Sequence, residues 1–369
     1  MNVKRTVAAA GAGLAVTMAM AMAAAVPAGA ATTGAGEPRW QALLDRIVAS
    51  GAVSAVAEVR DGTRTWRGTS GKARLGGARP APMDGRFRIG SVTKSFTATV
   101  VLQLAGEGKL SLSDSLERWL PGLVAGGSRI TVRHLLRHTS GIPEYSTTMF
   151  DKWGIPKERF RTWSARELVE MTDGLPREFA PGARYGYSNT NYIVLGMLIE
   201  KVTGSSYAAE VGQRILRPLS LRGTFVPGAS PEVPGPHAHA YARVTKGGQN
   251  VPVDVTRFNP TMAGSAGEII STTADLNRFF RALFQGRLLR PAQQKEMRDL
   301  GTIKEYGLGL EAGPLPCGTA WGHGGGTHGY STVAFSSADG SRQLALSMTP
   351  YSGDPEKAAM TMLIAALCS

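Results

Sequence analysis

The residues of this chain best suited to covalent catalysis lie in three short motifs. Ser91 and Lys94 form a Ser-x-x-Lys motif, whose spacing puts both side chains on one helix face, where the amine can take the hydroxyl proton. Tyr187 and Asn189 offer a phenol for proton relay and an amide for a substrate carbonyl. His323 heads a glycine-rich segment that predicts a strand open to an extended substrate. Together the motifs predict serine acyl transfer.

Each motif taken alone has an ordinary explanation. About one Ser-x-x-Lys is expected by chance in a chain of this size, usually on an exposed helix face. Tyr-x-Asn is common in turns, and His-Gly-Gly is common in loops. The catalytic interpretation rests on the ordered combination of all three. It is also favoured by the position of Ser91, which opens the apolar run 96–104 as a strand-to-helix junction would.

The elements that must hold these residues predict an α+β fold. Period-two patterns and Asp-Gly turns predict a five-stranded antiparallel sheet, with helices at both chain ends and a mostly helical lobe inserted between. The sheet lobe covers about 37–90 and 300–368, and the helical lobe about 91–299. The predicted strands are 53–60, 63–68, 319–323, 330–336 and 342–349, and the terminal helices are 37–49 and 356–367.

Capping residues locate the helices of the middle segment. Thr131, Ser164 and Thr272 predict helix starts, and the Ser164 sequence is a capping-box pattern. Gly204 predicts the end of an apolar helix over 192–202, and the Pro/Gly-rich stretch 227–236 predicts a surface loop. The three motifs then meet at the seam between the lobes, where ligand clefts usually form.

The first 30 residues predict a secretory signal peptide. A basic start at Lys4 and Arg5 precedes an Ala/Val/Met-rich stretch, and Ala28-Gly29-Ala30 fits a small-x-small cleavage site, with the cut near Ala30-Ala31. We therefore expect a secreted, extracellular protein in which residues 31–369 form a single catalytic domain without a membrane anchor. In an exported protein the two cysteines, Cys317 and Cys368, predict one disulfide.

The charge of the chain does not indicate a nucleic-acid partner. Loss of Lys4 and Arg5 lowers the formal net charge from +13 to +11, and the basic residues are scattered without a polybasic run. The charge favours either attraction to polyanionic cell-surface polymers or simple solubility. His237 and His239 lack a third ligand at metal spacing, so we take them as structural and expect no metal. We also expect no cofactor and a monomeric protein.

With these motifs the chain resembles the serine β-lactamase and penicillin-binding superfamily. The resemblance is to the branch of class C β-lactamases and secreted D-alanyl-D-alanine carboxypeptidases, particularly the exocellular actinomycete carboxypeptidase/transpeptidase. It rests on the segments 87–96, 187–191, 306–310 and 329–330 and on the cysteine pair, and it extends over about 38–368. A β-lactamase/transpeptidase-like fold is therefore implied.

The resemblance also implies roles for the motif residues. Ser91 would attack a carbonyl, Lys94 would help to deprotonate it, and Tyr187 would pass a proton to the leaving group. Asn189 would orient the acyl side chain. His323 would hold the Tyr187/Lys94 network.

The strand after His323 would supply the remaining contacts. The backbone N–H groups of Ser91 and Gly326 would form the oxyanion hole. Gly324 and Gly325 would lie against the substrate.

Three departures from the relative's pattern concern the substrate carboxylate. Gly324 and Gly326 stand where threonine hydroxyls would hold it, Glu311 stands where an arginine would bind it, and Met262 stands at the place of a tryptophan. A substrate with a free C-terminal carboxylate should therefore bind less well. Alternatively, Glu311 is simply a solvent-exposed charge beside the cleft.

The leading interpretation is a secreted serine hydrolase, D-alanyl-D-alanine carboxypeptidase-like and penicillin-binding, acting through an acyl-enzyme. The second is an esterase, amidase or D-amino-acid peptidase with an altered carboxylate subsite. The third is a non-catalytic β-lactam- or cell-wall-binding protein. Expected partners are peptide, ester or β-lactam substrates, and peptidoglycan.

Overall fold

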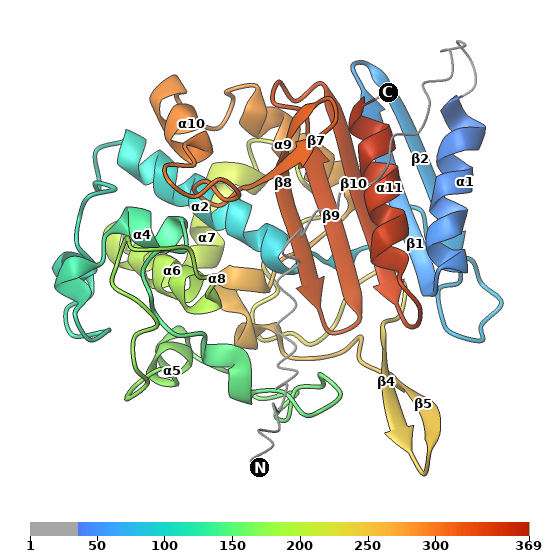
Figure 1. Ribbon diagram of the computed structural model, residues 1–369, viewed down its shortest axis with the longest axis horizontal. Helices are drawn as coiled ribbons and strands as arrows, with labels where there is room; N and C mark the ends of the chain where they lie inside the picture. Colours follow the sequence, from blue (N-terminus) through green and yellow to red (C-terminus); the bar gives the residue numbers. More distant parts are fainter. Residues whose placement is uncertain (1–35, 369) are drawn as a thin grey trace, which may run out of the picture.

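A six-stranded antiparallel sheet joins the two ends of the chain in the computed structural model, which describes residues 36–368. The predicted signal peptide and its cleavage site lie outside these residues. The strand order is β2-β1-β10-β9-β8-β7, as Figure 1 shows. The strands of this sheet are β1 Ala52–Asp61, β2 Arg64–Gly71, β7 Glu311–Leu315, β8 Gly318–Thr327, β9 Tyr330–Ser336 and β10 Arg342–Pro350.

The sixth strand, β7, corrects the prediction of five. Its sequence, Glu-Ala-Gly-Pro-Leu, has little strand propensity because glycine packs poorly and proline cannot donate to a ladder. An edge position tolerates both, since Pro314 is exposed there and β7 pairs only with β8. In this register Glu311 lies opposite Gly322, which brings its side chain beside the third motif.

Helices cover both faces of the sheet. Helices α1 (Gly36–Ala49) and α11 (Pro355–Cys368) pack together against one face (Figure 1), where Leu44, Ile47 and Leu363 are fully buried. Helix α9 (Thr273–Phe284) covers the opposite face. The Asn277 amide donates to the Glu58 carbonyl at 3.0 Å, which ties α9 to β1. The sheet is therefore the middle layer of its lobe.

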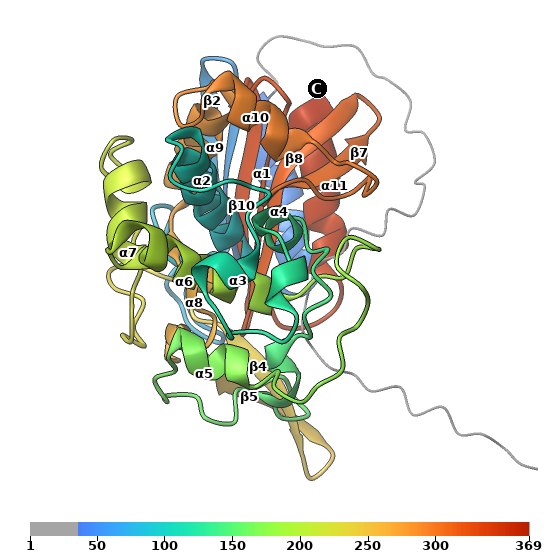
Figure 2. The ribbon, with the colours of Figure 1, turned by 90° about the vertical axis from the view of Figure 1, so that its left-hand side faces the viewer.

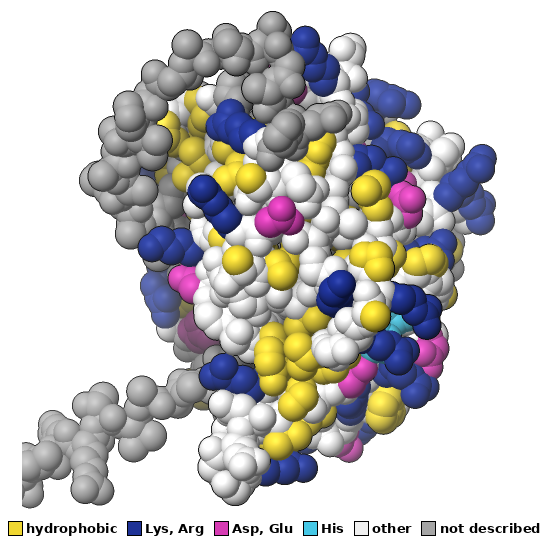
Figure 3. Space-filling view, turned by 90° about the vertical axis from the view of Figure 1, so that its right-hand side faces the viewer, with side chains coloured by type: hydrophobic (Ala, Val, Ile, Leu, Met, Phe, Trp, Pro, Cys, Tyr) yellow, Lys and Arg dark blue, Asp and Glu magenta, His cyan; other side chains and the backbone are white. Residues whose placement is uncertain are grey.

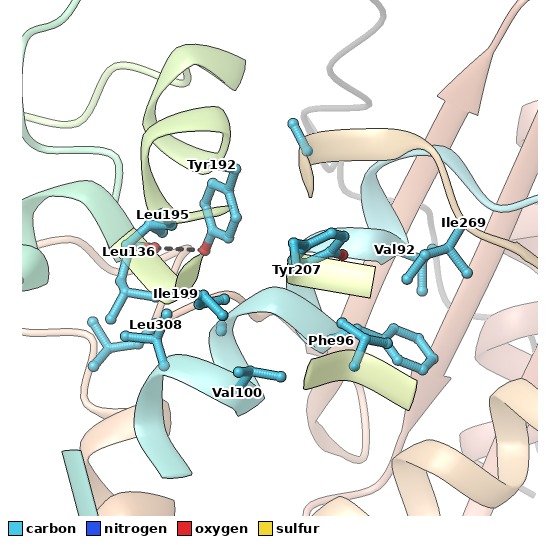
Figure 4. Close-up of a cluster of buried hydrophobic side chains, with 14 of the residues drawn as sticks. Val92, Phe96, Val100, Leu136, Tyr192, Leu195, Ile199, Tyr207, Ile269 and Leu308 are labelled. Atoms are coloured by element: carbon cyan, nitrogen blue, oxygen red, sulfur yellow. Dashed lines mark hydrogen bonds between the residues drawn. The ribbon is translucent and has the colours of Figure 1, made fainter. Parts of the chain in front are cut away.

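The helical lobe surrounds α2, the helix that follows Ser91 (Figure 2). Phe96 and Val100 of α2 are fully buried. The Tyr192 hydroxyl of the neighbouring helix donates to the Leu136 carbonyl at 2.9 Å within the same apolar cluster (Figure 4). The helices of this lobe are α2 Thr93–Gly106, α3 Leu116–Trp119, α4 Val132–Leu136, α5 Ala165–Glu170, α6 Asn189–Thr203, α7 Tyr207–Val211, α8 Gly264–Gly267 and α10 Pro291–Arg298.

The predicted capping residues cap the helices they were assigned to. Thr131 and Ser164 close capping boxes on α4 and α5, and the Thr272 side chain accepts the Asp275 N–H at the start of α9. Gly204 ends α6 with φ +71°, the left-handed conformation that glycine adopts readily. Local side-chain chemistry therefore set these helix ends.

Two small antiparallel pairs lie outside the main sheet: β3 Phe87–Arg88 with β6 Ile270–Ser271, and β4 Tyr241–Lys246 with β5 Gln249–Asp254. The second pair is a hairpin that projects from the body of the molecule (Figure 1). The sequence interpretation did not include it, although Gly247-Gly248 is a hairpin-turn signal.

Among residues 36–368, no helix has the length and apolar character needed to cross a membrane.

The surface of the sheet-lobe side carries mixed charge. Figure 3 shows Lys and Arg side chains spread over much of this face, with Asp and Glu among them and a hydrophobic patch in its lower half. No single basic stripe crosses the face in this view.

The structure places Cys317 and Cys368 in disulfide geometry, with Cα atoms 5.4 Å apart and 51 residues of sequence separation. We expect the crosslink to stabilise the folded protein by about 4 kcal/mol, because closing a loop of this length lowers the conformational entropy of the unfolded chain. Intact-mass analysis without reductant should find no alkylatable thiol, and Cys317→Ser/Cys368→Ser should lower the unfolding temperature. Two free thiols in the native protein would contradict this prediction.

Candidate active site

Ser91 lies where a short strand turns directly into a buried helix. It belongs to a single 3-10 turn, Gly90–Val92, between β3 and α2. Gly90 has φ +51°, and a Cβ at this position would lie 2.5 Å from the Gly326 carbonyl oxygen. Glycine therefore allows the Ser91 turn to approach the third motif closely.

Lys94 is fully buried one helical turn after Ser91. Its Nζ lies 3.1 Å from Ser91 Oγ, 2.7 Å from Asn189 Oδ1 and 2.9 Å from the Ala266 carbonyl. Burial lowers the pKa of Lys94 to about 7, against the opposing attraction of Glu144 and Glu311. A neutral amine can donate to Asn189 and Ala266 while its lone pair accepts the Ser91 proton, so Lys94 has the geometry of a general base.

Tyr187 approaches Ser91 from the helical lobe. Its hydroxyl donates to Ser91 Oγ at 2.9 Å, and burial raises its pKa well above the ordinary tyrosine value. The phenol therefore keeps its proton at neutral pH and is suited to donate it to a leaving group. Asn189, two residues later, is the first residue of α6 and lines the cavity.

The glycines of β8 allow this strand to lie close to the Ser91 segment. A Cβ on Gly325 would lie 2.0 Å from the Ile89 carbonyl oxygen, so no larger residue fits at this position. Gly326 lines the cavity together with Ser91, and their role as oxyanion-hole donors stays a prediction. Gly324 and Gly325 are not among the described lining residues.

His323 lies on the same strand with its side chain buried, and its hydrogen bonds differ from the expectation. Its Nε2 lies 2.9 Å from the Tyr306 hydroxyl, and its Nδ1 lies 2.5 Å from the Gly324 carbonyl and 3.2 Å from Glu311 Oε1. Burial lowers its pKa to about 3, so the ring is neutral. No hydrogen bond joins His323 to Lys94 or Tyr187 among the described contacts. His323 therefore does not hold Lys94 or Tyr187 through a direct hydrogen bond.

Glu311 faces the third motif. Its side chain is 18% exposed, and one oxygen accepts the Gly324 N–H at 3.3 Å. The alternative that it is a solvent-exposed charge is therefore wrong. Burial raises its pKa to about 8, and it is not among the residues lining the cavity. Glu311 is thus mostly protonated at neutral pH and is a partner of His323, whereas the sequence interpretation placed it against a substrate.

A cavity of about 420 Å³ opens at Ser91. Its described lining contains no lysine or arginine, while Glu144 and Glu356 contribute carboxylates. Met262 is part of the wall, consistent with its expected place in the active-site loop. Most of the wall is apolar or aromatic, from residues that include Tyr145, Phe150, Trp153, Val255, Phe258 and Tyr330.

From the sequence, no role was assigned to three residues near the site: Glu144, His138 and Tyr306. Glu144 accepts the Asn189 N–H at 2.5 Å and the Ser146 N–H at 3.0 Å, which fixes the start of α6. Local sequence gives no signal for these residues, because their partners lie in segments distant along the chain. For Tyr306 the one signal was indirect: it begins the Tyr-Gly-Leu-Gly-Leu segment, on which the family resemblance partly rests.

Within the described part of the chain, no cluster of three or more His, Cys, Asp or Glu side chains is arranged to hold a metal ion. His239, one of the two histidines assigned a structural role, has its Nδ1 2.7 Å from Asp254 Oδ2 at the base of the hairpin.

The sequence model of the Beta-lactamase family matches residues 40–367. Among curated proteins, penicillin-binding protein 4* of Bacillus subtilis (strain 168) is 32% identical over 279 residues, 71% of this chain and 60% of that protein. Esterase EstB of Burkholderia gladioli is 36% identical over 202 residues, 52% of this chain and 50% of that protein. The chain thus matches only 50–60% of the length of these two relatives.

Solved structures match over nearly the whole described chain. The D-stereospecific amidohydrolase from Streptomyces sp. has a TM-score of 0.81 and 41% identity, covering 89% of this chain and 99% of that one. The D-amino acid amidase from Ochrobactrum anthropi SV3, solved with L-phenylalanine amide, has a TM-score of 0.77 and 28% identity, covering 88% and 97%.

The family match, the six-stranded sheet with its helical lobe and the assembled Ser91/Lys94/Tyr187 group agree with one another. The chain belongs to the Beta-lactamase family of serine hydrolases, within the serine β-lactamase/transpeptidase superfamily.

Proposed function

We propose that the protein is an exported serine amidohydrolase that acylates Ser91 with amides, esters or short peptides of D-amino acids. The observation that carries this proposal is the cavity at Ser91, whose described lining has carboxylates at Glu144 and Glu356 and neither lysine nor arginine. A substrate carboxylate would find no cationic partner there, whereas an ammonium or a neutral amide meets no repulsion. The D-amino acid preference is proposed from the names of the structural relatives.

In the proposed acylation, Lys94 accepts the Ser91 proton as Oγ attacks the substrate carbonyl carbon. The N–H groups of Ser91 and Gly326 stabilise the oxyanion. As the carbon–nitrogen or carbon–oxygen bond breaks, Tyr187 gives its proton to the leaving group, and the proton held by Lys94 then restores Tyr187.

Water then attacks the acyl-enzyme carbonyl in the proposed deacylation. Its proton passes through the same groups to Ser91 Oγ, and the carboxylic acid leaves.

The apolar cavity wall favours a bulky acyl side chain. Phe150, Trp153 and Phe258 line the cavity, and burial of an aromatic side chain against them would contribute binding energy. We therefore expect D-phenylalanine amide to be a better substrate than D-alanine amide.

A matched pair of peptides tests the proposal: one ending in free D-Ala-D-Ala and the same peptide with a C-terminal amide. The two differ only in the carboxylate, and we expect kcat/KM to be at least about tenfold higher for the amidated peptide. D- and L-phenylalanine amides measured with the same preparation test the stereochemistry.

A preference for the free carboxylate would reject the amidase assignment and favour the D-alanyl-D-alanine carboxypeptidase alternative. Turnover of nitrocefin without turnover of the amides, peptides or esters would favour a β-lactamase. Faster turnover of p-nitrophenyl esters than of every amide would favour an esterase.

A further inference from the structure

His138, at the end of α4, has an unusual backbone conformation for a buried residue. Its side chain is fully buried and its φ is +57°. Such left-handed conformations cost of order 1–3 kcal/mol in residues other than glycine and cluster at functional sites. Within residues 36–368 the one other non-glycine residue with positive φ is Ser220. The position therefore needs an explanation beyond the end of a helix, which glycine or asparagine would provide with less strain.

The contacts of the imidazole go to the segment that begins at Tyr187. Its Nδ1 accepts the Ser188 N–H at 3.2 Å and lies 3.1 Å from Asn191 Nδ2. Since Ser140 Oγ donates to the oxygen of the Asn191 amide at 2.5 Å, the amide nitrogen faces His138 and donates to it. Two donors thus converge on one unprotonated ring nitrogen.

The ring face of His138 lies against the catalytic tyrosine. The centroids of the His138 and Tyr187 rings are 4.3 Å apart with 29° between their planes. On another side, the Tyr306 ring meets His138 edge-on at 4.9 Å, and the Tyr306 hydroxyl bonds His323. His138 therefore lies between the Tyr187 motif and the residues behind the third motif.

These contacts restrain Tyr187 in two ways. The bond to the Ser188 N–H fixes the main chain immediately after Tyr187, and the stacked ring limits rotation of the phenol. Both restraints bear on the 2.9 Å bond from the Tyr187 hydroxyl to Ser91 Oγ. A displacement of about 1 Å at such a bond can cost about a hundredfold in rate. The Nε2 atom of His138 is buried and has no hydrogen-bond partner among the described residues, so it adds no restraint of its own.

We propose that His138 is a positioning residue that holds the Tyr187 phenol in place to protonate the leaving group. The inference rests on the proposed acyl transfer at Ser91. It assigns His138 no contact with substrate and no proton transfer, and all of its effect on the reaction passes through Tyr187.

The leaving group supplies a readout that a purely structural role would not change. An amide leaving group must be protonated as it departs, whereas p-nitrophenolate departs without a proton. Loss of Tyr187 positioning should therefore slow amide hydrolysis much more than p-nitrophenyl ester hydrolysis. We expect the amide-to-ester ratio of kcat to fall at least about tenfold in His138 variants, with KM changed less than about threefold.

Two substitutions separate the two restraints. His138→Asn retains an acceptor for the Ser188 N–H and tolerates left-handed φ, but it lacks the ring. His138→Phe retains a ring against Tyr187 but lacks the acceptor. Ser220→Asn is the matched control, because it changes the other positive-φ residue in a turn that does not line the cavity. It should leave the ratio unchanged.

A double-mutant cycle with Tyr187→Phe tests the route of the effect. If His138 acts through the Tyr187 hydroxyl, adding His138→Asn to Tyr187→Phe should change amide turnover less than about threefold. Thermal melting identifies the variants that remain folded. In those variants, equal loss of amide and ester turnover, or full additivity with Tyr187→Phe, would overturn the positioning role.

Labelling of Ser91 by an activated ester separates this inference from the proposed function. Wild-type labelling with an unchanged leaving-group ratio in the His138 variants overturns the inference alone. No wild-type labelling and no turnover would overturn the proposed function and the positioning role together.

Discussion

Ser91→Ala is expected to abolish turnover of amides and esters and to prevent covalent labelling of the protein. Ser91 is the expected nucleophile because its Oγ lies 3.1 Å from the base, Lys94 Nζ, and accepts a hydrogen bond from the Tyr187 hydroxyl at 2.9 Å. Removal of a nucleophile in such groups typically costs a thousandfold or more, about 10³ to 10⁶ in kcat. The loss should appear in kcat, because the alanine removes one oxygen and leaves the cavity otherwise unchanged.

The measurement is peptide mapping after reaction with a p-nitrophenyl ester or a β-lactam. In the wild type the added mass should lie on the tryptic peptide that contains Ser91, and it should be absent from Ser91→Ala. Ser113→Ala, at an exposed serine remote from the cavity lining, serves as the control and should label normally. Residual turnover by Ser91→Ala at the wild-type rate would end the acyl-enzyme hypothesis.

Lys94→Met should be nearly as damaging as loss of the nucleophile, because it removes the base while keeping a side chain of similar length. The fully buried Nζ has three oxygen partners within 3.1 Å, so its position is set by Ser91, Asn189 and Ala266. We expect a loss of about a thousandfold in kcat for amide hydrolysis, with unfolding still cooperative. Methionine cannot accept a proton at this position. Activity close to wild type in this variant would show that another group deprotonates Ser91.

The pH dependence of the wild-type enzyme tests the same assignment without a substitution. Burial lowers the pKa of Lys94 to about 7, and only the neutral amine can accept the Ser91 proton. The rate constant kcat/KM for an uncharged ester should therefore rise with pH through a midpoint near 7. Tyr187→Phe should keep this rising limb, since the pKa of Tyr187 lies well above its usual value. A midpoint near the ordinary lysine pKa would count against Lys94 as the base.

The substrate argument changed in substance once the structure was known. The sequence placed a charged Glu311 against the substrate, where it would repel a carboxylate. In the structure the Glu311 carboxyl group instead accepts the Gly324 N–H and lies beside His323, and burial raises the pKa of Glu311 to about 8. Poor carboxylate binding is still expected, but its cause is now the absence of a lysine or arginine from the described cavity wall and the presence of Glu144 and Glu356.

Several features were set by the sequence alone because their causes are local. The Ser-x-x-Lys spacing places Ser91 and Lys94 on one face of a helix. Thr131, Ser164 and Thr272 cap helices through bonds to residues three positions later. The alternating strands and their turns identify five of the six strands of the main sheet. Each of these results depends on residues within a few positions of one another, so the order of residues is enough to predict them.

Tertiary structure alone decided the features whose causes lie far apart in the chain. Strand β7 exists because an edge of the sheet tolerates its glycine and proline, and its register then places Glu311 beside His323. The pKa of Lys94 is lowered by burial among three separate segments, which no local pattern encodes. The contact of His138 with Tyr187 arises because the end of α4 packs on the loop before α6. The sequence thus identified the groups that carry out the chemistry, whereas long-range packing determined their protonation states, their neighbours and the charge of the cavity they face.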